Sequence, residues 1–177
     1  MKFRDNPDEG LKRFAALVEE MNGESDRAVA IVGAAWVEEG LSDAITSFMR
    51  PHKKSQERLF GANGPLSTFS AKINLARLLG MVTDAIWSDL HVIRDIRNEF
   101  AHHIAHKRDH TRLDFKAEHI GDKCIALRCV AHQNLSDPRD AFTRACAVLN
   151  SDFDLQTMME DKVSDTFRVF AKGVDEG

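Results

Sequence analysis

The stretch that decides the fold is residues 83–104, TDAIWSDLHVIRDIRNEFAHHI. Apolar side chains recur in it at intervals of three and four residues, which is the period of one face of an α-helix. The stretch opens on Thr83, a residue type that caps helix N-termini. The spacing therefore predicts a helix that begins just after Thr83. Its apolar stripe consists of Ile86, Leu90, Ile93, Ile96, Phe100 and Ile104.

The same spacing occurs on both sides of this stretch, and no segment shows the alternation typical of a strand. Ser25 is a natural cap for a helix that carries apolar side chains on two faces, which predicts a central position, and Gly40 is expected to kink or interrupt it. A last amphipathic segment is expected to break near Asp161. We therefore expect an all-α fold, an irregular bundle of about seven helices. The predicted helices cover about residues 8–22, 26–49, 55–60, 66–79, 84–104, 121–129, 138–149 and 153–170.

Length and composition suit one globular domain spanning residues 1–177, because 43% of the chain is hydrophobic and 29% is charged. Cys124, Cys129 and Cys146 are odd in number and form no Cys-x-x-Cys pair, which indicates core residues in a reducing compartment. The chain has neither the apolar run of a signal peptide nor one long enough to span a membrane. We therefore expect a cytoplasmic protein without membrane contact.

The formal net charge of −4 disfavours a protein that binds DNA over its whole surface, because Lys and Arg must neutralise phosphates. A local basic patch follows the long helix, and Lys107, Arg108 and Arg112 are its candidates for contact with nucleic acid. Few aromatic residues interleave with them, so a solvated polar loop is the simpler interpretation.

Arg97 lies among the apolar residues of the long helix. On a helical wheel with Ile86 at zero it falls at about 20°, in the middle of the stripe. Burying a guanidinium without a carboxylate is strongly unfavourable. We therefore expect Arg97 to pair with Glu38 or Glu39 on the central helix and to hold the bundle together.

Arg94, Asn98 and His102 stand four residues apart and form a polar line beside the stripe, at about 80°, 120° and 160° on the same wheel. This line is expected to face solvent or a second subunit. In a purely structural interpretation, Asn98 bonds to nearby backbone, and His102 and His103 interact with the negative end of the helix dipole.

Three segments resemble the mannitol operon repressor family: FSAKI at residues 69–73, ARLLGM at 76–81 and RDIRNEFAH at 94–102. In that family an "F-x-x-K-I…A-x-x-L-G" stretch precedes "I-R-N-x-F-A-H". The resemblance covers about residues 25–160 and implies an all-helical bacterial transcriptional regulator of sugar-alcohol uptake without a recognisable helix-turn-helix. Together with the acidic composition, it favours regulation through a protein partner and indirect association with DNA.

The same segment also resembles HEPN-type helical domains, in which an Arg, a polar residue and a His form a metal-independent ribonuclease site. Arg97 and Asn98 with His102 satisfy that spacing, and His103 satisfies its longer variant. The resemblance implies that the His would move the proton of a ribose 2′-OH while the Arg stabilises charge on the phosphate. Regulator and ribonuclease are therefore two alternatives, of which the sequence favours the non-enzymatic one.

No cofactor or metal is expected. His102, His106 and His110 stand four apart, but no carboxylate or cysteine completes a standard ligand set, and no Gly-rich phosphate loop, nucleophile elbow or His-Glu-x-x-His motif occurs. Trp36 and Trp87 are expected in the core. Because the central helix is apolar on two sides, a homodimer is a further expectation.

Overall fold

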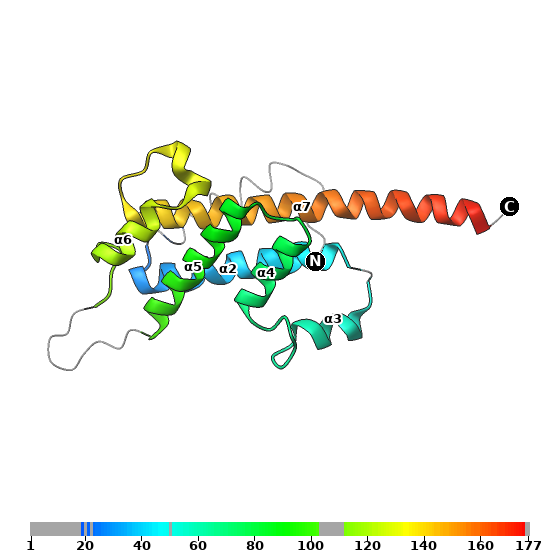
Figure 1. The fold of residues 1–177 in the computed structure, drawn as a ribbon, viewed down its shortest axis with the longest axis horizontal. Coiled ribbons are helices and arrows are strands. Elements are labelled where there is room, and N and C mark those ends of the chain that lie inside the picture. The colour runs from blue at the N-terminus through cyan, green and yellow to red at the C-terminus, as the bar shows by residue number, and fades with distance from the viewer. Residues whose placement is uncertain (1–18, 20, 22, 50, 103–111, 176–177) are drawn as a thin grey trace.

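The structure is a computed structural model that describes residues 19, 21, 23–49, 51–102 and 112–175, with side chains up to residue 159. Over these residues the chain is helical and contains no strand, which confirms the all-α prediction (Figure 1). The helices are α2 (Asp26–Ser47), α3 (Lys53–Phe60), α4 (Phe69–Leu78), α5 (Asp84–His102), α6 (Glu118–Ile125), the 3-10 helix η1 (Arg128–Gln133) and α7 (Pro138–Asp175).

The predicted caps are in place. The Ser25 hydroxyl accepts a hydrogen bond from the backbone N–H of Ala28 at the start of α2, and the Thr83 hydroxyl accepts one from Ile86 at the start of α5. Each bond satisfies a backbone donor that has no partner within its helix. The two longest sequence-predicted helices of the core therefore begin where their cap residues indicate.

Helices α2 and α7 lie side by side and run in the same direction (Figure 1). Arg139 near the start of α7 forms an ion pair with Asp26 at the start of α2, and further along Asn150 lies against Gly40. A Cβ atom on Gly40 would overlap the Asn150 side chain. Gly40 does not interrupt α2, as the sequence suggested it would, and instead lets α7 approach closely.

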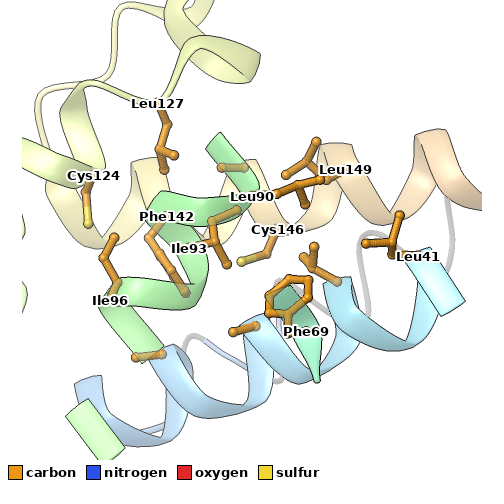
Figure 2. Packing of buried hydrophobic residues seen from close by; sticks show 14 of the residues in the cluster. Leu41, Phe69, Leu90, Ile93, Ile96, Cys124, Leu127, Phe142, Cys146 and Leu149 are labelled. Atoms are coloured by element: carbon orange, nitrogen blue, oxygen red, sulfur yellow. The ribbon is translucent and has the colours of Figure 1, made fainter. Parts of the chain in front are cut away.

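Helix α5 packs across the α2–α7 pair with the predicted apolar stripe facing inward. Figure 2 shows its side chains among those of α7 and α2, and Leu90, Ile93, Ile96 and Phe100 are buried. Ile86 is half-buried, and Ile104 lies outside the described residues. The side chains labelled around α5 in Figure 2 are Leu41, Phe69, Cys124, Leu127, Phe142, Cys146 and Leu149.

The three cysteines are free thiols, as expected of core residues. Cys124 and Cys146 are fully buried, and Cys129 is half-buried against the core. Burial raises the pKa of the Cys124 thiol to about 12, so it stays protonated at neutral pH.

Two predicted boundaries are wrong. The segments expected at 138–149 and 153–170, with a break near Asp161, form one continuous helix of 38 residues. No Pro or Gly occurs between residues 139 and 172, so nothing in the backbone chemistry stops it. The helix expected at 121–129 instead begins at Glu118 and gives way to η1. The first expected helix, at 8–22, lies almost wholly outside the described residues.

Of the helices that the structure describes, none combines the length and the apolar character needed to cross a bilayer.

Replacing Gly40 by Leu should lower the free energy of unfolding by about 1–3 kcal/mol, because the new side chain must displace Asn150 and push α7 away from α2. Thermal or urea unfolding followed by circular dichroism measures this change. The matched control is Gly23→Leu, since nothing lies within 4 Å of a Cβ at that position. Equal stabilities of the two variants would show that the close approach of α2 and α7 at Gly40 does not limit the packing.

Candidate functional site

The predicted ion pair between Arg97 and a glutamate of α2 is wrong. Glu38 instead accepts from Lys72 of α4, with 2.7 Å between Nζ and Oε1 and both side chains largely buried. Glu39 is exposed, and no ion pair joins it to Arg97, although the structure describes both. Arg97 itself is half-buried and donates to Asn98 Oδ1 at 3.2 Å.

The physical reason is a shift of the buried face of α5. Asp89 and Ile96 are buried on one side of the stripe, so its centre lies further from Arg97 than the apolar residues alone suggested. Arg97 therefore lies at the edge of the face, where a long side chain can keep its guanidinium near water.

Asp89 is the carboxylate that α5 does bury, with 2% of its surface exposed. It accepts a hydrogen bond from the backbone N–H of Cys129 at 2.8 Å and so ties α5 to η1. A sequence signal for it existed, because Asp89 stands four residues before Ile93 and seven before Ile96, on the apolar face. A second tie comes from Glu99, which forms an ion pair with Lys123 of α6 and lies 2.9 Å from Nε2 of His119 through Oε2.

The predicted polar line lies on α5 outside the core. Arg94 and Asn98 are half-buried and His102, the last residue of α5, is exposed. The line continues toward the start of the helix through His91 and Trp87, which follow at intervals of three and four residues. Arg94 Nη1 lies 3.1 Å from His91 Nδ1, and the rings of His91 and Trp87 meet edge to face at 4.8 Å between centroids.

Helix α4 contributes to the same surface. The guanidinium of Arg77 stacks over Trp87 at 4.3 Å, and the indole N–H of Trp87 donates to Asn74 Oδ1 at 3.1 Å. Trp87, expected in the core, does pack against it, but the side chain is only half-buried, and its polar N–H and its cationic partner lie at the surface. We call the set Arg77, Trp87, His91, Arg94 and Asn98 the α4–α5 surface.

Both arginines of the α4–α5 surface are paired locally. Nη2 of Arg77 lies 2.9 Å from Oδ1 of Asp84, and Nη2 of Arg94 lies 2.6 Å from Oδ1 of Asp95. Aromatic and arginine side chains of this kind are enriched at protein interfaces, where paired cations can exchange one carboxylate for another. The chemistry of the surface therefore suits a protein partner better than a bare phosphate backbone.

Most of the remaining predicted residues fall outside the described part of the chain. His103, Lys107 and Arg108 lie outside the described residues, as do His106 and His110. Arg112 is exposed and lines a cavity beside the end of α5. Within the described part of the chain, no group of three or more His, Cys, Asp or Glu side chains is placed to hold a metal ion.

Comparison with known proteins leaves the sequence without a match, since neither a family model nor a curated protein matches it. Among solved structures, the fold is similar to that of a chain in the X-ray structure of the MtlR–HPr complex from Escherichia coli, with a TM-score of 0.65. The match covers 79% of this chain and 97% of that chain at 18% sequence identity. It confirms an MtlR-like fold, as the resemblance to the mannitol operon repressors implied.

The imidazole of His91 should titrate below its ordinary range. Partial burial lowers the His91 pKa, the charge of Arg94 lowers it further, and Asp95 opposes them. The folded protein therefore binds fewer protons than the unfolded chain just below pH 6.5, and the free energy of unfolding should fall as the pH falls through that range.

Replacing Arg94 by Gln should raise the His91 pKa, because it removes a neighbouring positive charge and leaves Asp95 without its partner. An NMR titration of the His91 ring protons measures the titration midpoint of His91 in the wild type and in Arg94→Gln. Arg144→Gln on α7 is the control and should leave the His91 midpoint unchanged. An unchanged midpoint in Arg94→Gln would contradict the contact between the two side chains.

Proposed function

We propose that this chain is a cytoplasmic, repressor-like transcriptional regulator of sugar-alcohol utilisation in a bacterium, and that it acts through a protein partner. The observation that carries the proposal is the fold, which matches 97% of a chain solved in a complex with the protein HPr. The motif resemblance over residues 69–102 points in the same direction from the sequence. The fold concerns backbone arrangement, and the motif concerns residue identity.

The α4–α5 surface supports docking of a protein. Trp87 offers a large apolar area that is already held in place by Arg77 and Asn74, so little conformational entropy would be lost on binding. Arg77 and Arg94 flank it as exchangeable cations. A partner with an apolar contact point bordered by carboxylates fits this arrangement.

The charge of the chain supports indirect association with DNA. A net charge of −4 repels the phosphate backbone of DNA. The three candidate contacts Lys107, Arg108 and Arg112 add few positive charges to offset that repulsion. In this proposal the regulator reaches an operator through its partner.

The test is a calorimetric titration of the chain with HPr from the same organism. We expect saturable binding, weakened at least about tenfold by Trp87→Ala because truncation removes the central anchor; tenfold corresponds to about 1.4 kcal/mol. Arg144→Ala, an exposed position on α7, is the matched control and should bind like the wild type. If Trp87→Ala binds HPr as tightly as the wild type, the binding site lies elsewhere on the chain. If the wild type does not bind HPr, HPr is not the partner.

The ribonuclease alternative retains one favourable observation: Arg97 and Asn98 are in contact, and His102 is exposed at the end of the same helix. Against it, residues five apart on a helix point about 140° away from each other, so Arg97 and His102 do not share a face. The regulator therefore remains the proposal.

Incubation of labelled RNA with the purified chain in the presence of a chelator distinguishes the alternatives. We expect no cleavage above background for wild type and for His102→Ala alike. Cleavage by the wild type that His102→Ala abolishes would replace the regulator by the ribonuclease.

A further inference from the structure

Positive charge is concentrated in one segment of this acidic chain. Between residues 44 and 83 the sequence has six Lys or Arg residues and one acidic residue, Glu57, although the formal net charge of the whole chain is −4. Two of the six, Lys72 and Arg77, form ion pairs with carboxylates of α2 and α5. The other cations that the structure describes in this segment are all exposed on α3: Lys53, Lys54 and Arg58.

Helix α3 stands away from the α2–α7 pair (Figure 1), and none of its side chains is fully buried. Its half-buried side chains are Gln56, Leu59 and Phe60, which share one face of the helix, and Phe60 packs against the edge of the core. Lys54 and Arg58 stand four residues apart on the opposite face. Helix α3 therefore presents these two cations away from the bundle.

Local contacts at its two ends hold α3 in place. At the start, Nδ1 of His52 accepts the backbone N–H of Ser55 at 3.2 Å. After the end, the chain turns back, and the backbone N–H of Leu66 donates to the carbonyl of Leu59 at 2.9 Å. A Cβ on Gly64 would overlap that carbonyl oxygen, so the turn requires glycine there. A helix fixed in this way loses little backbone entropy when its side chains bind a partner.

The cations on the outward face of α3 are not neutralised within the protein. Glu57, the one carboxylate of α3, lies 3.9 Å from Nζ of Lys53, and both side chains are exposed. An exposed pair of this kind contributes little and exchanges readily. Within the part of the chain that the structure describes, no carboxylate forms an ion pair with Lys54 or Arg58. Both charges are therefore available to an anionic partner.

The composition of the outward face decides the class of partner. Between Lys54 and Arg58 it carries no apolar side chain, so it has neither the aromatic centre typical of a protein interface nor the apolar face of a helix that inserts into a membrane surface. The two residues lie about 6 Å apart along the helix axis. Phosphates follow one another every 3.4 Å or so, roughly, along each strand of a DNA duplex, so two long cationic side chains can each reach one.

We propose that the outward face of α3 contacts the phosphate backbone of double-stranded DNA through Lys54 and Arg58, without reading its sequence. The choice of DNA rests on the proposed function, because a regulator that reaches an operator through its partner is held beside a duplex there. Two phosphate contacts are weak by themselves. A partner that holds the chain at the operator raises the effective concentration of α3 at the duplex, so a weak contact contributes there.

Fluorescence anisotropy of a labelled DNA duplex, titrated with the full chain alone, tests the contact. We expect saturable binding with a Kd of about 1 mM or tighter at about 20 mM salt, equal for duplexes of unrelated sequence. A plot of log affinity against log salt concentration should have a slope of about −2, because each neutralised phosphate releases about 0.9 counterions. No saturable binding at this salt concentration, or a slope near zero, would overturn the proposal.

Two variants of α3 should change binding in opposite directions. Lys54→Gln should bring the slope to about −1 and weaken binding at least about fivefold at about 20 mM salt. Glu57→Gln releases Lys53 from its carboxylate, so it should bring the slope to about −3 and tighten binding. Loss of folding cannot produce both effects, and circular dichroism checks each variant. Lys116→Gln, an exposed lysine outside the segment, is the matched control. Equal slopes in all four proteins would overturn the assignment to α3.

Two further ligands test the choice of duplex DNA. Single-stranded RNA of the same length should give a shallower slope, because a single strand releases fewer counterions for each contact. Vesicles containing phosphatidylglycerol should not capture the chain. Tighter binding to either ligand than to the duplex, at equal phosphate concentration, would overturn DNA as the partner of α3. Because no HPr is present in these titrations, their outcome is distinguishable from a failure of the HPr titration.

Discussion

The close approach of α2 and α7 is the constraint on which the rest of the structure depends. At Gly40 a Cβ would overlap Oδ1 of Asn150 and lie 3.6 Å from Cβ of Phe153, and at Gly33 a Cβ would lie 3.2 Å from Cys146 Sγ. Such contacts exclude water and let two long helices share one apolar layer. The ion pair of Asp26 with Arg139 aligns the same helices at their starts. Helices α4, α5 and α6 bury their apolar faces against the surface that α2 and α7 form together.

Because α5 packs on the α2–α7 pair, its two faces have different environments. Its inward face buries Ile93, Ile96 and Phe100 together with one carboxylate, Asp89, whose partner is a backbone N–H rather than a cation. Its outward face carries polar and aromatic side chains that contact α4 but not the core centre. The backbone N–H of Cys129 satisfies the buried carboxylate of Asp89. Helix α5 therefore needs no buried arginine to pair with it.

The described contacts of residues 97–102 are therefore mostly structural. Glu99 holds α6, and Phe100 lies in the core. Arg97 and Asn98 bond to each other at the edge. The α4–α5 surface and the inward side chain Phe100 lie on different sides of the same helix.

Local periodicity and cap chemistry determined much of the fold from the sequence by itself. The stripe of α5, its start after Thr83 and the start of α2 after Ser25 follow from the 3.6-residue period and from side-chain oxygens near free backbone donors. These properties concern residues within a few positions of each other. The polar line of Arg94, Asn98 and His102 was found in the same way.

Only the tertiary structure decided which distant groups meet. Glu38 pairs with Lys72, which is 34 residues away along the chain. The glutamate expected to pair with Arg97 therefore has a different partner. Trp87 packs against the core but is only half-buried, and Arg77 of another helix stacks on it. Gly40 proved to be a contact point instead of a break. A one-dimensional pattern shows how apolar a helix face is, but the partner of a polar group depends on how separate helices are placed in three dimensions.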